Sequence, residues 1–337
     1  MERTAAYRTL EAKPSENSII KPGELVDLVE MTPLTLNDRR IYNQLLAHAW
    51  DRVQEPGEHV IAKRDLRGSH NANDRVGDSI ERLMAAIVKV RVVRDGERAV
   101  ERVQLLGSNT EHESPDGMLR YEFPARLREI IKESTIFARL QKEVMFALSS
   151  KYALALYEMV QKRGNMTMKS YEDFDIGEFR ELLGVPRGKL PMWGNLHQRA
   201  LAPAIKEVNA LSDYTVELEP LKTGRKISGV RMRWSRKEQD EVSGVMAELK
   251  RPKVGRKARI EGRVEDVSFG GRGRSEGNGL LRTETYEEAR RLFPGYDIYH
   301  VEQEWRAWMA GKGELPENVD RAYLGFFTRF VDRHPLA

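Results

Sequence analysis

The sequence predicts an α+β fold that is mainly helical and divided into several parts, and three observations support this prediction. The chain has 337 residues, and a single hydrophobic core seldom grows that large. Hydrophobic residues make up 40% of it and charged residues 32%, as in a polar globular protein. Two segments also repeat one order of elements, three helices followed by two strands, which suggests an internal duplication.

The first segment combines helical and strand signals in that order. Thr35 and Asp38 have the spacing of a capping box, which predicts a helix start, and apolar residues then recur at helical spacing. A valine-rich stretch and its partner, joined by turn residues, predict a hairpin. The predicted elements are helices at 32–53, 61–68 and 74–90 and strands at 90–93 and 99–107.

The second segment follows the same plan, with one anomaly in its third helix. Pro203 lies inside that helix although proline has no backbone N–H to donate, which predicts a bend at this point. The predicted elements are helices at 148–163, 175–185 and 193–209 and strands at 214–220 and 226–234.

Three helices followed by a hairpin form the plan of a winged helix, in which the third helix enters the major groove of DNA. We therefore expect two tandem winged-helix domains in the body of the chain. The expected parts are a flexible N-terminus at 1–19, winged-helix domains at 20–146 and 147–237, a flexible basic linker at 238–282 and a small C-terminal helical subdomain at 283–337.

The linker prediction depends on composition, because 250–282 is rich in Gly and Arg and poor in aromatic residues, so it buries little apolar area. The tail that follows is dense in aromatic residues at helical spacing. These aromatic residues form either the core of the subdomain, the interpretation we favour, or a surface that docks another protein.

The third helix of the second domain has a polar stripe opposite its apolar face. Asn195, Arg199, Ala202 and Lys206 recur at i, i+4, i+7 and i+11. In a major groove Arg bonds guanine and Asn bonds adenine, although a polar stripe is also ordinary on a surface helix. Basic residues before the helix and on the hairpin favour DNA binding. The candidates are Arg187, Lys189, Asn195, Gln198, Arg199, Lys206, Lys222, Arg225 and Lys226.

The third helix and hairpin of the first domain have a comparable layout, with polar residues opposite an apolar face and arginines on the hairpin. The candidates for DNA contact there are Arg75, Ser79, Arg82, Lys89, Arg94 and Arg98.

Residue patterns for catalysis are scarce. The sequence has no phosphate-binding GxxxxGK[ST] loop, no metal-ligand spacing among its seven histidines and no cysteine, which excludes disulfides and thiolate chemistry. Glu172, Asp173 and Asp175 directly precede a predicted helix, where negative charge favours the helix dipole. We expect no enzyme activity, no cofactor and no metal.

The residues from 1 to 18 lack the apolar core of a secretory signal, and no apolar run is long enough to cross a bilayer. We therefore expect a cytoplasmic protein without a membrane partner. The formal net charge is only +4, a weak argument for an anionic partner by itself.

At LSSKYALALYEMV, FRELLGV and ALAPAIKEVNALSDYTVELEPLKTGRKISGVRMRW the sequence resembles the plasmid replication initiators that bind iterons. The resemblance is specific from Leu148 to Trp234 and weaker from Ile20 to Phe146. It implies two winged-helix domains, of which the second binds the repeated sites of the origin and the first contacts the rest of each repeat. It also implies dimers that pair through the first domain and repress their own gene, opening of an AT-rich region, and loading of the host initiator and replicative helicase.

Two alternatives remain at this point. A winged-helix transcriptional regulator without a replication role has the same DNA-binding surfaces, so only a replication assay separates it from an initiator. A primase or nuclease requires an acidic metal cluster, which the sequence does not contain.

Overall fold

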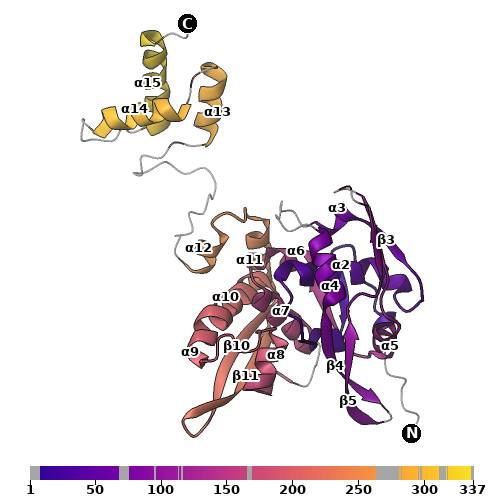
Figure 1. The fold of residues 1–337 in the computed structure, drawn as a ribbon. Coiled ribbons are helices and arrows are strands. Elements are labelled where there is room, and N and C mark those ends of the chain that lie inside the picture. The colour runs from indigo at the N-terminus through magenta and orange to yellow at the C-terminus, as the bar shows by residue number, and fades with distance from the viewer. Residues whose placement is uncertain are drawn as a thin grey trace. The chain divides into compact units, whose positions relative to one another are not determined.

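The computed structural model describes residues 8–67, 76–94, 96–112, 114, 117–164, 169–262, 281, 283–294, 296, 298–310, 316 and 318–334. The chain divides into two compact units, Met1–Glu265 and Asp266–Ala337, and each is described by itself. The larger unit holds both expected winged-helix domains, coloured from indigo to orange in Figure 1.

The first domain, WH1, surrounds helix α2, which begins with the expected capping box. The Thr35 side chain accepts from the backbone N–H of Asp38, and the Asp38 carboxylate accepts from the N–H of Thr35. The described elements are η1 (Thr9–Glu11), β1 (Ser18–Pro22), α1 (Gly23–Val26), β2 (Val29–Glu30), α2 (Leu36–Ala49), η2 (Trp50–Arg52), β3 (His59–Ala62), α3 (Lys63–Leu66), α4 (Val76–Ala85), β4 (Ile87–Arg94), β5 (Glu97–Gln104), β6 (Asn109–Glu111), β7 (Met118–Tyr121), α5 (Ala125–Glu133), β8 (Phe137–Gln141) and α6 (Lys142–Ala147).

Helix α4 is shorter than the sequence predicts, because its C-terminal part becomes strand β4 from Ile87 onward. That part contains three β-branched residues, Ile87, Val88 and Val90, which favour a strand. β4 pairs antiparallel with β5 as the wing of WH1 and with β2 on its other side.

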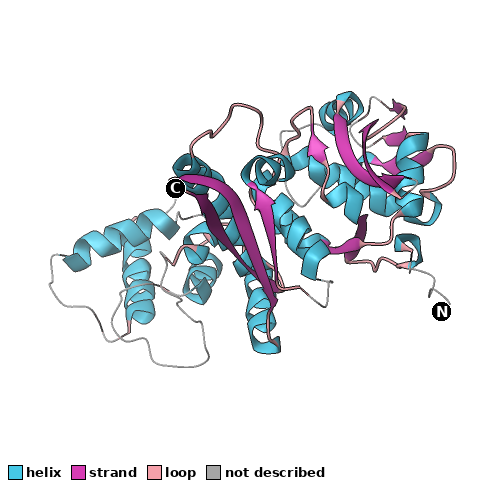
Figure 2. Ribbon diagram, turned by 90° about the horizontal axis from the view of Figure 1, so that it is seen from below, coloured by secondary structure: helices cyan, strands magenta, loops and turns pink. Residues whose placement is uncertain are grey.

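The second domain, WH2, repeats the arrangement of WH1, with α7, α8 and the helical segment from α9 to α10 in the places of α2, α3 and α4. Its wing, β10–β11, is long in Figures 1 and 2, and β11 also pairs with β9, a strand that the sequence did not predict. The prediction of two winged-helix domains is confirmed. The elements are α7 (Lys151–Gly164), β9 (Tyr171–Asp175), α8 (Ile176–Leu182), α9 (Trp193–Leu196), η3 (His197–Leu201), α10 (Ala202–Leu211), β10 (Tyr214–Thr223) and β11 (Lys226–Arg236).

The hydrophobic cores of the two domains do not stop at a domain boundary. The core built on α7 and α10 also includes Ile19 of β1, Leu140 of β8 and Met145 of α6. A second core surrounds α2, with Tyr42, Leu45 and other fully buried residues. WH1 and WH2 therefore form one packed body.

Residues 238–262 are not a flexible linker, which corrects the sequence prediction for this part. They form α11 (Gln239–Lys250) and α12 (Arg256–Ile260), and α11 starts with a capping box between Glu238 and Glu241. Val245 and Leu249 are buried in the WH2 core, which stabilises α11 on the body. The rest of the predicted linker, 263–280 and Arg282, lies outside the described residues.

The predicted flexible N-terminus is also wrong for residues 8–19. Thr9 is buried, and its hydroxyl lies 2.9 Å from that of Ser134. The Trp50 indole N–H donates to the Ala12 carbonyl at 2.9 Å, and Ser18 already belongs to β1. Residues 1–7 lie outside the described part of the chain.

The C-terminal unit contains the expected helices α13 (Thr283–Leu292), α14 (Ile298–Ala310) and α15 (Val319–Arg333). Trp305, Tyr323 and Phe327 are almost fully buried and form its core with Ala289 and Val301. Aromatic residues therefore build this core, as we favoured, although Trp308 remains 41% exposed.

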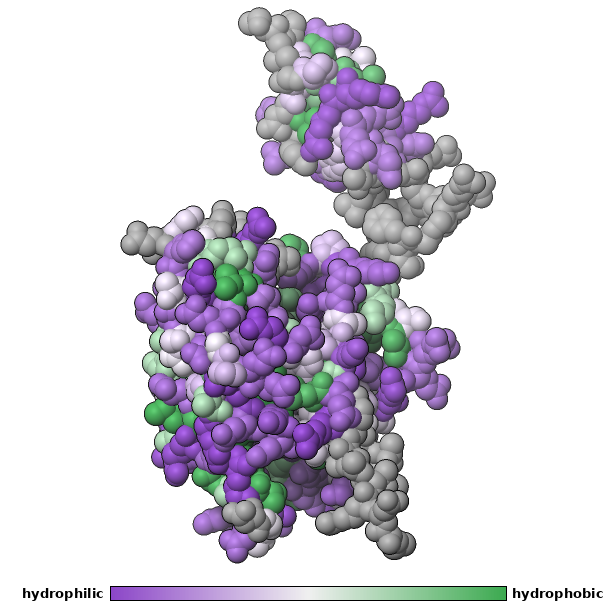
Figure 3. All heavy atoms as spheres, turned by 90° about the vertical axis from the view of Figure 1, so that its right-hand side faces the viewer, coloured by the Kyte–Doolittle hydropathy of each residue, from purple (hydrophilic) through white to green (hydrophobic). Residues whose placement is uncertain are grey.

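Hydrophilic side chains cover most of the surface seen in Figure 3, and hydrophobic ones occur there in small groups. Across the described residues, no helix combines the length and apolar composition that a bilayer crossing requires.

Candidate nucleic-acid interface

The recognition helix of WH2, residues 193–211, accommodates its proline through a widened turn. Residues His197–Leu201 form a π turn, in which the N–H of Ala202 donates to the carbonyl of His197, five residues back. Pro203 follows within the first turn of α10, where a missing N–H is tolerated best. The sequence predicted a bend at Pro203, and the structure instead has a π turn directly before it.

The two faces of the recognition helix agree with the sequence prediction. Leu196, Ala200, Leu201, Ala204 and Val208 are buried in the WH2 core. The candidates on the opposite face, Asn195, Gln198, Arg199 and Lys206, are exposed, and Ala202 is half-buried. The polar stripe is therefore available to the edges of bases in a major groove.

Basic residues flank the recognition helix on the preceding loop. Arg187 and Lys189 are exposed there, in a loop where Gly188 and Leu190 have positive φ values of 76° and 50°. Arg180 holds this loop by donating to the carbonyl of Leu190 at 2.7 Å and to that of Lys189. The loop thus presents two cations next to the start of the helix.

The tip of the WH2 wing presents three more cations. Lys222, Arg225 and Lys226 are exposed around the turn at Gly224, whose φ of +62° suits glycine. A hairpin in this position contacts flanking phosphates in winged-helix proteins. All nine candidates that the sequence gave for WH2 lie on this exposed face or its borders.

The WH1 candidates Ser79 and Arg82 do not form a reading surface, which corrects the sequence prediction. Ser79 is fully buried, and its hydroxyl accepts from Asn37 and Arg82 at 3.1 Å each. Arg82 donates to both oxygens of the buried Asp38 carboxylate at 2.9–3.0 Å. These two residues stabilise the packing of α4 against the start of α2.

This contact also perturbs the titration of Asp38. Burial alone raises the pKa of its carboxyl, but hydrogen bonds from Arg82 and from the backbone N–H of Thr35 outweigh burial and hold the pKa below its ordinary value. Asp38 is therefore a stable anion that orients Arg82 inward.

Other WH1 candidates differ in availability. Arg94 pairs with Glu101 at 2.8 Å and with Glu133, so it is engaged within the protein and not directed at DNA. Lys89 is half-buried on β4, whereas Arg98 is exposed on the wing. Arg75 lies outside the described residues.

Buried ionic contacts fix WH1 against WH2. Lys21 of β1 donates to Glu158 of α7 at 2.8 Å, and Asn43 of α2 donates to the same carboxylate at 2.7 Å. The side chains of Lys21 and Glu158 are only 4% and 1% exposed. Burial lowers the pKa of Lys21, although the adjacent Glu158 acts against this shift.

A second contact joins the two domains at α1. Asp27 accepts from Lys162 at 2.6 Å and from Arg163 at 2.9 and 3.0 Å, both on α7. Arg163 also pairs with Glu172 of β9 at 2.7 Å. Burial alone raises the pKa of Asp27, but these two cations lower it below its ordinary value.

The three acids that the sequence placed before a helix have structural partners: Glu172 pairs with Arg163, Asp173 pairs with Arg231, and Asp175 caps α8.

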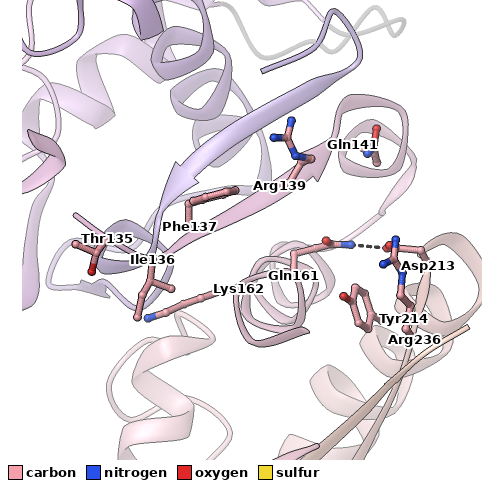
Figure 4. A pocket seen from close by; sticks show the side chains of 10 residues that line it. All are labelled: Thr135, Ile136, Phe137, Arg139, Gln141, Gln161, Lys162, Asp213, Tyr214 and Arg236. Atoms are coloured by element: carbon pink, nitrogen blue, oxygen red, sulfur yellow. Dashed lines mark hydrogen bonds between the residues drawn. The ribbon is translucent and has the colours of Figure 1, made fainter. Parts of the chain in front are cut away.

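A cleft of about 500 Å³ lies between β8, α7 and the base of the WH2 wing (Figure 4). Arg139, Lys162 and Arg236 contribute positive charge to its lining, and Gln161 donates to Asp213 at 2.5 Å. Asp213 is the one acid among the described residues that line it, so the cleft offers no pair of carboxylates for acid–base chemistry. Within the described ranges of the chain, no cluster of three or more His, Asp or Glu residues suited to a metal ion occurs.

Two packed winged-helix domains, one of which presents an exposed polar helix between a basic loop and a basic wing, define a tandem winged-helix DNA-binding protein. Comparison with models of protein families identifies the family within this class. The model described as "Initiator Replication protein, WH1" matches residues 18–161, and that described as "Initiator Rep protein, WH2" matches residues 175–234. Together they cover more than half of the chain, which belongs to this family of plasmid replication initiators.

Two solved structures are similar to the chain. One is the Pi initiator protein in complex with iteron DNA, with 18% identity, a TM-score of 0.45, and coverage of 67% of this chain and 100% of that one. The other contains domains 2 and 3 of RctB, with 11% identity, a TM-score of 0.34, and coverage of 66% and 89%. No curated protein matches the chain.

Proposed function

We propose that this initiator binds repeated sites, iterons, at a plasmid origin through the recognition helix of WH2. The observation that carries the proposal is the exposed stripe of Asn195, Gln198, Arg199 and Lys206, bordered by cations on the loop and wing. Arg and Asn suit guanine and adenine edges, and the surrounding cations suit phosphates. This division of roles supports specific binding by the helix and positioning by its neighbours.

In this proposal WH1 contacts the remaining part of each repeat through its wing and not through helix α4. Arg98 is exposed there, whereas Ser79 is buried and the half-buried Arg82 is paired with Asp38. A contact between the WH1 wing and the phosphate backbone of the DNA adds affinity but does not read bases. The buried contacts between Lys21, Asn43 and Glu158 then set the spacing between the two DNA-binding surfaces.

The later steps of initiation belong to the same proposal. Bound initiators open an adjacent AT-rich region and help to load the host initiator and the replicative helicase, without enzymatic activity of their own. Dimers that pair through WH1 repress the initiator gene and so contribute to control of copy number. Membership of the initiator family supports this assignment over that of a regulator without a replication role.

The test combines binding with replication. We expect the full chain to bind direct repeats found beside its gene, and Arg199→Ala together with Lys206→Ala to abolish that preference while the circular dichroism spectrum stays unchanged. Lys132→Ala, at an exposed position on α5, is the matched control. A small plasmid that carries only the gene and these repeats should replicate with the wild-type gene and not with the double variant. Binding without replication of the wild-type plasmid would support the regulator instead.

A further inference from the structure

Helices α11 and α12, here called the arm (residues 239–262), lie beyond the part of WH2 that the family model matches, which ends at residue 234. Both helices contact α10 of the recognition helix. Val245 and Leu249 of α11 enter the WH2 core, and Ile260 of α12 packs against the same core. The arm is therefore a fixed addition to WH2.

Two arginines close the arm into a defined shape. Arg256 is buried and donates to the carbonyls of Glu248, Leu249 and Arg251 at 3.0–3.2 Å. These carbonyls lie at the C-terminal end of α11, where the last carbonyls of a helix lack their usual i+4 partners, and the Glu248 carbonyl also accepts from the backbone N–H of Arg251 at 3.2 Å. Arg259 donates to the Glu248 carboxylate at 2.7 Å. The side chains of Arg256 and Arg259 thus serve the structure of the arm.

The C-terminal end of the arm carries an excess of positive charge. Six Lys or Arg residues occur between positions 250 and 261, against a single acid, Glu261. The nearest carboxylate on α11, Glu248, is shared by Arg251, Arg256 and Arg259. Lys250 and Lys257 are exposed at this end. Two long, flexible cations therefore extend into solvent from a rigid base.

The arm borders the exposed stripe of the recognition helix. Lys206 of that stripe is exposed, whereas Ala210, one turn later, is half-buried against the core that Ile260 also contacts. Figure 1 shows α11 and α12 on the side of α10 away from the tip of the β10–β11 wing. A helix inserted in a major groove about 12 Å wide has a phosphate backbone on each side. The wing tip and the arm lie on different sides of α10, as two elements that contact these two backbones would.

We propose that the arm is a further DNA-contacting element, which binds the phosphate backbone on the flank of the site opposite the WH2 wing, through Lys250 and Lys257. The proposal rests on the proposed function, because it requires the recognition helix to lie in the major groove. The contact adds affinity for any DNA sequence and does not read bases.

The experiment uses the full chain with Lys250→Ala and Lys257→Ala, and with Lys13→Ala and Lys132→Ala as a control that removes the same charge from exposed positions of WH1. Binding of a fluorescent repeat and of an unrelated duplex is measured against salt. The slope of log K against log salt is negative, and loss of two phosphate contacts should reduce its magnitude by about 1.8. The ratio of the wild-type association constant to that of the variant should then fall about twelvefold between about 50 mM and about 200 mM salt.

Hydroxyl-radical footprints locate the contact. The arm variant should lose protection on one flank of the repeat only, with the same proportional loss of affinity for both duplexes. An unchanged slope and footprint, or a loss equal to that of the control, overturns the proposal. The Arg199→Ala and Lys206→Ala variant separates this failure from failure of the proposed function, since it tests the preference for the repeat itself. Thermal unfolding confirms that each variant is folded.

Discussion

The buried contact between Lys21 and Glu158 gives a sharp test of how the two domains are joined. In Glu158→Gln, the amide oxygen still accepts from Asn43, but the negative charge opposite Lys21 is lost. The Lys21 ammonium, only 4% exposed, then remains in the interior without its counter-charge. We expect a clear loss of stability because burying an unpaired charge is unfavourable.

The magnitude follows from the burial of both side chains. Breaking a buried ion pair by removing one partner costs about 3–5 kcal/mol, and the retained hydrogen bond from Asn43 places Glu158→Gln near about 3 kcal/mol. With a urea dependence of about 3 kcal/mol per molar, the unfolding midpoint falls by about 1 M. Chemical unfolding followed by circular dichroism measures this shift.

A second substitution shows whether the unpaired charge is the cause. Lys21→Met in the Glu158→Gln background removes the buried ammonium, so it should recover most of the lost stability, since apolar residues often replace a buried ion pair without net cost. Our reasoning is refuted if Glu158→Gln stays within about 0.5 kcal/mol of the wild type, or if Lys21→Met adds a further loss.

Three more predictions concern the two winged helices. Arg82→Ala should lower the free energy of unfolding by about 1–3 kcal/mol without changing the preference for particular bases in DNA. A changed base preference would show instead that Arg82 contacts bases. The pKa of Asp38 is lowered in the folded state, so stability should fall as pH drops below about 4, and Asp38→Asn should reduce this dependence, the remainder coming from other acids such as Asp27; equal acid sensitivity of both proteins would contradict it. Lys222→Ala with Arg225→Ala and Lys226→Ala should lower the salt slope of DNA binding by about 2.7, whereas an unchanged slope would exclude a phosphate contact by the wing.

The order of the main elements could be predicted because local signals specify it. The capping box of Thr35 and Asp38, the helical spacing of apolar residues and the turn before Lys226 each depend on neighbours in the sequence. Strand β9 has no such signal, since its sequence YEDFD is short and acidic. Its pairing with β11 is stabilised by tertiary contacts such as that of Asp173 with Arg231.

The start of the predicted linker was wrong because composition was averaged over too long a segment. Residues 238–250 contain their own helix signals, with acids at the first turn and Val245 and Leu249 at helical spacing. The glycine-rich part that follows obscured these signals.

The exposed polar face of the third helix of WH2 could be predicted because a helical wheel places core and polar faces correctly when one side packs on its own domain. The same wheel failed for α4, where Ser79 and Arg82 face α2. The pairing of Arg82 with a buried acid 44 residues earlier in the chain cannot be recognised from local spacing. The π turn before Pro203 was also missed, since a wheel assumes a constant helical repeat.

Selection of binding sites from random DNA, performed with the full chain and with Arg199→Ala, tests the central assignment most directly. We predict that the wild type selects a defined site and that the variant selects the same site with preference relaxed at one or two adjacent base pairs, by about 1–3 kcal/mol of discrimination. Preference that is unchanged at every position would contradict base reading by the recognition helix of WH2.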